Sequence, residues 1–187
     1  NLEFFGTAAV VCGVSAADQT ICQGGSATVN IATPGLVNPT FQWLVTTGVS
    51  NPTSGTNVIV TPPVTTTYQV QVSQAASPSA PSFVDTAVFT ITIAAPPSPY
   101  AGLDDTVCMG MPINLSGTVA SGANTHSWQT VTTGISPSPT VNFSPNFQSL
   151  TPTVTVNQPG LYRFVLREGN AACGTFRDRA TVLVINP

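Results

Sequence analysis

The four basic residues of the chain are all arginines, and they fall in one short stretch near the C-terminus: Arg163, Arg167, Arg177 and Arg179. Because apolar residues alternate with them, we expect their side chains to lie on facing strands of one hairpin. Guanidinium groups bind carboxylates and phosphates in a planar fork, which would make this hairpin a site for an anionic glycan. The alternative, which the sequence favours, is a solvated face on which the arginines pair with Glu168 and Asp178.

Other residues capable of chemistry are few. His126 is the only histidine, and we expect it in a loop that leads into the strand of Trp128. No G-x-S-x-G motif supplies a nucleophile for a catalytic triad. Asp104 and Asp105 are adjacent, but calcium needs six or more oxygen ligands, so we predict a turn-capping role for this pair. The sequence therefore predicts no enzyme, no metal site and no cofactor.

The composition is that of a folded protein with an uncharged polar surface. Charged residues make up 6% and hydrophobic residues 42% of the chain, whereas about 25% of residues are charged in ordinary soluble domains. A net charge of −3 without any lysine excludes extensive contacts with nucleic-acid phosphates. No apolar run approaches the roughly 18 residues that would indicate a membrane span. These features favour a β protein from outside the cytoplasm.

A tandem duplication organises the chain. The stretch "WLVTTG" begins at Trp43, and the similar "WQTVTTG" begins at Trp128. Other landmarks recur in the same order in both halves: "DQTICQGG" with "DTVCMG", "TTTYQVQV" with "GLYRFVL", and "DTAVFTITI" with "DRATVLVI". Between the copies, "AAPPSP" is rich in proline, which favours a stiff, extended connector.

Each copy is predicted to be a β-sandwich of about seven short strands. Apolar and polar residues alternate after Tyr68 and again after Tyr162, so one face of each strand should enter a core. Trp43 and Trp128, one per copy, are expected in these cores, and Tyr162 is placed as a tyrosine corner. The predicted architecture is all-β, with an N-terminal extended segment at residues 1–16, domains at 17–95 and 100–187, and a proline-rich linker at 96–99.

The second copy carries a family resemblance. "DDTVCMGMPINL", the tryptophan, "PGLYRFVL" and "NAACGTFRDRATVLVI" resemble the PKD-like and Ig-like repeats of bacterial surface adhesins, which are common in large secreted proteins of gliding bacteria. The resemblance covers nearly all of residues 98–187 and, less closely, residues 17–95. It implies two tandem Ig-like or PKD-like sandwiches at a cell surface, and it implies no particular ligand.

The resemblance also implies a disulfide between Cys108 and Cys173, which leaves Cys12 to pair with Cys22. In a simple immunoglobulin layout, however, Cys108 and Cys173 lie at opposite ends of the sandwich, beyond the roughly 7 Å between Cα atoms that a disulfide can span. Free, buried thiols are the alternative. Zinc is disfavoured because no two cysteines have the close spacing of a zinc-ligand pair.

The N-terminal "NLEFFGTAAVVCGV" lacks the basic residues that open a secretion signal, so we expect it to be part of the folded structure. An extended apolar segment can complete a sheet edge of its own domain, of a preceding domain in a longer chain, or of a neighbouring subunit. The last arrangement is head-to-tail and builds a filament when it does not close into a ring. The residues expected to make such strand contacts are Leu2, Phe4, Phe5, Val10 and Val11.

Together these patterns predict a non-catalytic extracellular module that is structural or adhesive in a bacterial surface protein. The alternatives are a self-assembling filament subunit joined by strand donation and a carbohydrate-binding module. Partners would be other protein subunits or surface glycans, with a homo-oligomer in the filament case. "DTA" and "DTV" resemble a short O-glycosylation acceptor of some gut and gliding bacteria, which makes Thr86 and Thr106 candidate acceptors.

Overall fold

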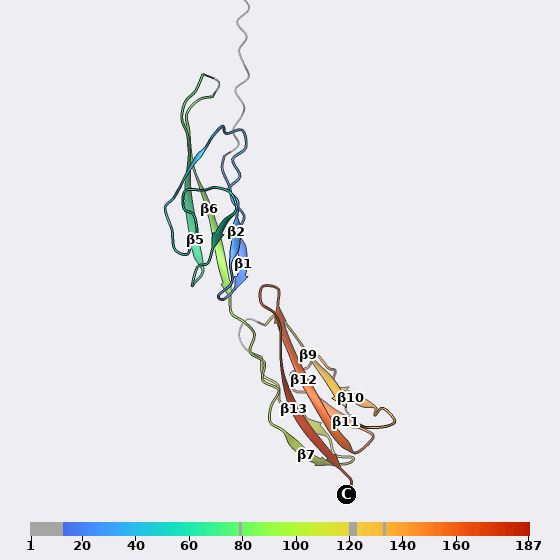
Figure 1. Ribbon diagram of the computed structural model, residues 1–187. Helices are drawn as coiled ribbons and strands as arrows, with labels where there is room; N and C mark the ends of the chain where they lie inside the picture. Colours follow the sequence, from blue (N-terminus) through green and yellow to red (C-terminus); the bar gives the residue numbers. More distant parts are fainter. Residues whose placement is uncertain (1–12, 79, 120–122, 133) are drawn as a thin grey trace, which may run out of the picture. The chain divides into compact units, whose positions relative to one another are not determined.

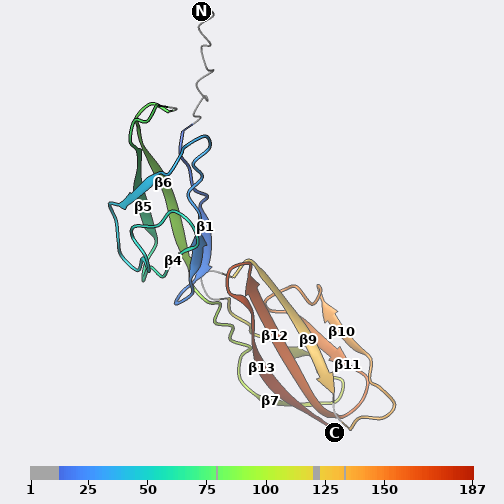
Figure 2. The ribbon, with the colours of Figure 1, turned by 45° about the horizontal axis from the view of Figure 1, so that its top comes forward.

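A computed structural model of the chain describes residues 13–78, 80–119, 123–132 and 134–187. The chain divides into two compact units between Ala94 and Ala95, here called the first and the second domain. Regular structure in the described residues is all β-strand, and no helix there is long and apolar enough to cross a membrane. The ribbons in Figures 1 and 2 show that the strands of each domain pack in layers.

The first domain is a sandwich of two sheets. Its larger sheet has the strand order β1-β6-β5-β3, and its smaller sheet pairs β2 with β4. Neighbouring strands are antiparallel except β1 and β6, which run parallel. The strands are β1 (Gln19–Cys22), β2 (Ala27–Val29), β3 (Thr40–Trp43), β4 (Val58–Val60), β5 (Thr66–Gln74) and β6 (Phe83–Ala94).

The second domain repeats this plan. Its larger sheet has the order β7-β13-β12-β9, with β7 parallel to β13, and its smaller sheet has the order β10-β11-β8. The strands are β7 (Asp105–Cys108), β8 (Ile113–Asn114), β9 (Thr125–Thr132), β10 (Val141–Ser144), β11 (Thr153–Val156), β12 (Gly160–Asn170) and β13 (Gly174–Ile185). The repeat in the sequence is therefore a repeat in topology.

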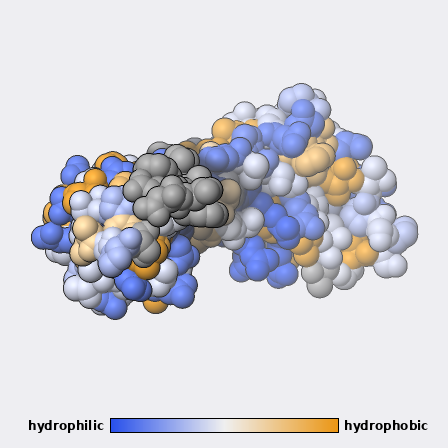
Figure 3. Space-filling view, turned by 90° about the horizontal axis from the view of Figure 1, so that it is seen from above, coloured by the Kyte–Doolittle hydropathy of each residue, from blue (hydrophilic) through white to orange (hydrophobic). Residues whose placement is uncertain are grey.

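Alternating side chains build both cores. The fully buried residues of the two central strands occupy every second position: Tyr68, Val70 and Val72 in β5, and Tyr162, Phe164 and Leu166 in β12. Burial of each large apolar side chain contributes about 1.5–3 kcal/mol. On the surface, apolar residues are interspersed with polar ones instead of gathering in one patch on the face that Figure 3 shows.

The two tryptophans lie in the cores but differ in their hydrogen bonding. Trp43 is 5% exposed and Trp128 is 3% exposed. Trp43 Nε1 donates a hydrogen bond to the carbonyl oxygen of Ser54 at 2.9 Å. Trp128 Nε1 finds no acceptor within the part of the chain that is described. A buried N–H without an acceptor costs free energy, so the second tryptophan is held by packing alone.

The two buried tyrosines fix the turns beside them. Tyr162 OH donates to the carbonyl oxygen of Gln158 at 2.7 Å, a bond a few residues upstream as in a tyrosine corner. Tyr68 OH donates to the carbonyl oxygen of Thr47 at 2.6 Å, within the "TTG" turn that follows the tryptophan strand. Burial raises the pKa of both tyrosines, which keeps the hydroxyls neutral as donors.

Aspartate side chains accept hydrogen bonds from backbone N–H groups at equivalent places in the two domains. The four bonds run from Thr90 N to Asp18 and from Thr181 N to Asp104, each at 2.6 Å, and from Val14 N to Asp85 at 3.1 Å and Ala101 N to Asp178 at 2.9 Å. These carboxylates therefore fasten loops to strands. The described residues contain no cluster of three or more His, Cys, Asp and Glu that could hold a metal ion.

The expected pairing of Cys108 with Cys173 is wrong. Cys22 and Cys173 are disulfide-bonded, whereas Cys108 is a free, exposed thiol. Cys108 lies level with Ile185 at the end of β13, and Cys173 precedes the first residue of that strand, so about 36 Å of strand separates them. The bond expected between Cys12 and Cys22 involves Cys12, which lies outside the described residues.

Part of the predicted architecture lies outside the described residues. This applies to Cys12 and to the residues that we expect to make strand contacts, Leu2, Phe4, Phe5, Val10 and Val11. Docking of this segment in its own domain or in a neighbouring subunit stays a prediction.

Candidate functional site

The four arginines lie together on the outward side of the larger sheet of the second domain. Across β12 and β13, Arg167 is directly opposite Arg177, and Val165 is directly opposite Arg179. Alternate positions of a strand face the same side, so Arg163 shares this side, and Val131 lies opposite it on β9. We call this surface the arginine face, and its members are Val131, Arg163, Val165, Arg167, Arg177 and Arg179.

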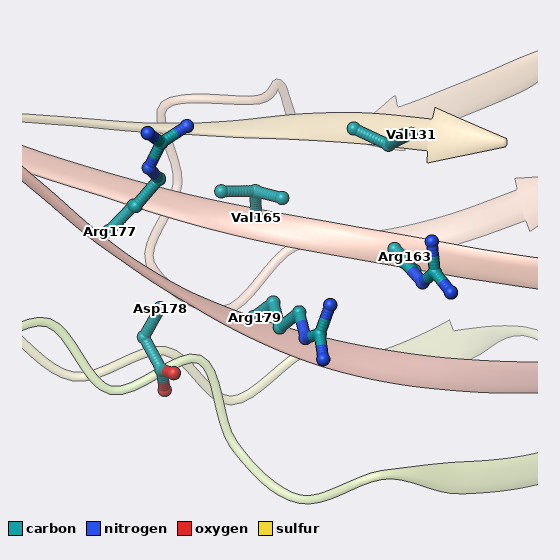
Figure 4. A pocket seen from close by; sticks show the side chains of 6 residues that line it. All are labelled: Val131, Arg163, Val165, Arg177, Asp178 and Arg179. Atoms are coloured by element: carbon teal, nitrogen blue, oxygen red, sulfur yellow. The ribbon is translucent and has the colours of Figure 1, made fainter.

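The arginine face is accessible and slightly hollowed. Arg163 and Val165 are half-buried, whereas Arg167, Arg177 and Arg179 are exposed. Five of its members, with Asp178, line a depression of about 480 Å³. Figure 4 shows the side chains of Arg163, Arg177 and Arg179 rising around Val165 from β12 and β13. A flat ligand lying across these strands could contact several guanidinium groups at once.

The two acidic residues expected as partners direct their carboxylates away from the guanidinium groups, so the predicted pairing is wrong. Glu168 belongs to the alternating set of β12 that points into the sandwich, and it is 1% exposed. Asp178 turns to the other side of β13, where its Oδ2 accepts the N–H of Ala101; in Figure 4 its carboxylate points away from the arginines. Within the described residues, no acidic side chain forms an ion pair with any of the four arginines.

Positive charge is therefore concentrated on this face, and no carboxylate of the described residues neutralises it. Like charges directly opposite each other on neighbouring strands destabilise a sheet, and Arg167 and Arg177 stand in this relation. Asp104, just before β7, accepts a hydrogen bond from the backbone N–H of Thr181 through its Oδ1. The sheet tolerates this repulsion because the guanidinium groups remain in water, where their interaction is screened.

The chemistry available on this face is recognition of anions. Each guanidinium offers five N–H donors in a fixed fork that matches carboxylate, sulfate or phosphate oxygens. Beside the arginines, Ser127 and Gln129 of the edge strand β9 continue the same side of the sheet with a hydroxyl and an amide. Both groups can form hydrogen bonds with the hydroxyl groups of a sugar. The period-two pattern of β12 was the sequence signal for this face, since it separates Arg163 and Arg167 from Glu168.

The other candidate residues lie apart. His126 is in β9 and not in the preceding loop, and its register partner is Glu168. Ser127, its neighbour in sequence, belongs to the opposite side of the strand, so the pair lacks the activated nucleophile of triad chemistry. Thr106 is exposed in β7 and Thr86 is half-buried in β6, and their O-glycosylation stays a prediction.

Comparison with known proteins gives the fold. No family model and no curated protein matches the chain. Among solved structures, extracellular domains 3–5 of Drosophila OTK match with a TM-score of 0.57 and 15% identity, covering 91% of this chain and 60% of that chain. Sidekick-1 immunoglobulin domains 1–4 match with a TM-score of 0.55 and 13% identity, covering 95% of this chain and 48% of that chain.

Titin domains I67–I69, as an E-to-A variant, match with a TM-score of 0.53 and 13% identity, covering 92% of this chain and 64% of that chain. The chain thus spans less than two thirds of each of these three structures. At such identities the likeness concerns the fold alone. The chain is an all-β protein of immunoglobulin-like β-sandwiches.

Proposed function

We propose that the chain is a non-catalytic, extracellular adhesive segment of a bacterial surface protein, and that its second domain binds an acidic polysaccharide through the arginine face. The observation that carries the proposal is the concentration of all the basic residues on one accessible sheet face, where no acidic residue of the described part of the chain forms an ion pair with them. The disulfide-bonded cysteines support an oxidising compartment. The resemblance to adhesin repeats supports the cell surface.

A polyanionic glycan fits this surface better than other anions. The surface is a sheet face without a deep pocket, so it suits an extended ligand more than a small one. With four arginines against seven acidic residues in the chain, it is too weakly basic for long runs of nucleic-acid phosphates. Uronate or sulfate groups along a sugar chain would form charge-assisted hydrogen bonds with the guanidinium groups. Ser127 and Gln129 would form hydrogen bonds with the hydroxyl groups of the sugar.

The expected affinity of one face is low. Exposed ion pairs contribute about 0.2–1 kcal/mol each, so the four arginines together supply about 1–4 kcal/mol, which corresponds to a Kd near or above the millimolar range. A polymer that engages many copies at a surface raises the effective affinity without any new contact. Weak sites repeated along a surface protein are suited to adhesion.

The proposal predicts selective, salt-sensitive binding. The purified chain, immobilised at high density, should retain polygalacturonate and dextran sulfate at low salt and should not retain dextran. Binding should disappear near 1 M salt, because the Debye length falls from about 10 Å at 0.1 M to about 3 Å. Biolayer interferometry with the polymers in solution measures both effects.

Three outcomes would contradict the proposal. Equal retention of dextran would indicate recognition of neutral sugars, and retention that is insensitive to salt would show that the arginines are not used. Retention of polyglutamate without either acidic polysaccharide would assign the face to an acidic protein instead.

A further inference from the structure

A further hollow adjoins the arginine face at the beginning of the edge strand β9. The depression of the arginine face shares Arg177 with a second one of about 300 Å³, and the second shares Arg167 with a third of about 360 Å³. Phe147 and Gln148, from the turn that follows β10, also line the third depression, which we call the Phe147 hollow. The surface that a ligand can contact therefore continues past the arginines.

Phe147 presents an aromatic ring to water at this hollow, because the residue is 52% exposed. Its backbone is nonetheless held in place. The N–H of Trp128 donates to the carbonyl oxygen of Phe147 at 2.7 Å, and the N–H of Gln148 donates to Asn146 Oδ1 at 2.8 Å. A ligand that packs on a side chain held by such a backbone has little ordering of the protein to offset.

The first domain builds the same turn without the ring. In the turn that follows β3, the N–H of Trp43 donates to the carbonyl oxygen of Pro52 at 3.4 Å, and the N–H of Thr53 donates to the Asn51 side chain. Pro52 thus takes the place of Phe147, so the turn does not require an aromatic residue. The first domain also has no arginine or lysine. The exposed ring and the arginines occur together, which indicates that they serve one ligand.

The other groups in the Phe147 hollow suit an uncharged sugar ring. Thr125, Ser127 and Thr175 contribute hydroxyl groups, and Gln148 contributes an amide; these groups form hydrogen bonds with sugar hydroxyls. The carboxyl group of Glu168 also lines the hollow, so a second carboxylate would be repelled there. A sugar ring has an apolar C–H face that can pack on a phenyl ring and bury apolar area.

We propose that Phe147 stacks on a neutral sugar of the same polysaccharide whose acidic groups bind the arginine face, so that the preferred ligand alternates acidic and neutral sugars. This inference rests on the proposed function and specifies its ligand. Arg167 borders both the Phe147 hollow and the arginines, so an acidic sugar bound to Arg167 places a neighbouring sugar over the hollow. A polymer that is acidic at every sugar would bring a carboxylate towards Glu168 instead.

The test compares polygalacturonate, which is acidic at every sugar, with hyaluronate, in which uronate and neutral N-acetylated sugars alternate. Ion pairing alone would favour polygalacturonate, since it carries more charges for the same length. We expect the wild-type chain to bind hyaluronate at least as tightly. Phe147→Ala and Phe147→Pro should weaken hyaluronate binding by about three- to tenfold and leave polygalacturonate binding nearly unchanged, as measured by biolayer interferometry at one salt concentration.

Two controls accompany these variants. Phe147→Tyr keeps the ring and should bind hyaluronate as the wild type does. Leu103→Ala removes an apolar residue of the second domain that is 81% exposed and does not line the hollow, and it should change neither affinity. Phe147→Pro copies the turn of the first domain, so it should fold; thermal unfolding followed by tryptophan fluorescence checks this.

The outcomes separate this inference from the proposed function. Unchanged hyaluronate binding in Phe147→Ala and Phe147→Pro, an equal loss for both polymers, or tighter binding of polygalacturonate by the wild-type chain would overturn the stacking role and leave the arginine face in place. A wild-type chain that binds neither polymer would refute the arginine face, and this inference with it.

Discussion

Trp43→Ala is expected to lower the free energy of unfolding of the first domain by about 3–5 kcal/mol. The indole is buried and meets Tyr68 and Phe89 edge-on, at ring-centroid distances of 5.7 and 5.8 Å. Truncation removes these contacts, leaves a cavity, and deprives the Ser54 carbonyl oxygen of its donor. Differential scanning calorimetry should show one transition at a lower temperature.

The second domain supplies an internal control for this experiment. In Trp43→Ala the only remaining indole is Trp128, so fluorescence follows the unfolding of the second domain alone, and that transition should be unchanged. In the equivalent Trp128→Ala variant, the second domain should be destabilised, and the fluorescence of Trp43 should report an unchanged unfolding transition of the first domain. Emission typical of a water-exposed indole from either folded variant would contradict the burial of the tryptophans and move them to a binding surface.

A conservative pair of variants separates packing from hydrogen bonding. Trp43→Phe loses the bond to Ser54, whereas Trp128→Phe removes an N–H that has no acceptor among the described residues. A buried hydrogen bond is worth about 0.5–1.5 kcal/mol net. Trp43→Phe should therefore cost about 1 kcal/mol more than Trp128→Phe, as measured by denaturant unfolding. An equal or reversed order would contradict the bonding described here.

The double variant Arg167→Gln with Arg177→Gln is expected to lose binding to acidic polysaccharide by about tenfold or more, since two of four weak ion pairs vanish and the loss is multiplied over many copies. Its stability should stay the same or rise by about 0.2–1 kcal/mol, because two like charges no longer face each other across the strands. Binding should therefore fall without any loss of stability, which a merely structural role would not produce.

The matched control keeps the charge. Arg167→Lys with Arg177→Lys preserves two positive charges but replaces the planar fork by point charges. It should bind better than the glutamine variant and less well than the wild-type chain. Equal binding by all three proteins would show that these arginines are not in the site, whereas a loss of folding in the glutamine variant would show that they are needed for the sheet.

Much of the fold could be predicted from the sequence because its signals are local. Apolar and polar residues alternate around Tyr68 and Tyr162. Because successive side chains of a strand point to opposite faces, this alternation determines which residues enter the core. The same alternation also shows why Glu168 and Asp178 do not pair with the arginines. Glu168 is in phase with Tyr162 and Asp178 is in phase with the buried residues of β13, so neither could pair with arginines on the outward side.

The state of each cysteine could not be predicted because it depends on which residues far apart in sequence become neighbours. A family resemblance suggested Cys108 with Cys173, yet the length of β13 separates these two residues. Likewise, the bonds from Thr90 N to Asp18 and from Thr181 N to Asp104 depend on which strands become neighbours. The recurrence of aspartate in both copies indicated a structural role. It did not indicate which backbone N–H group donates a hydrogen bond to each aspartate.

The most direct test of the central claim is amide chemical-shift mapping of the isotope-labelled chain during titration with an acidic oligosaccharide such as a galacturonate oligomer. The account predicts that the shifted amides lie in β9, β12 and β13 around Arg163, Arg167 and Arg179. The amide resonances of the β10-β11-β8 sheet and of the first domain should not shift. Added salt should reverse the shifts seen in β9, β12 and β13. Shifts centred on another surface, or none at concentrations that saturate binding to the polymer, would contradict it.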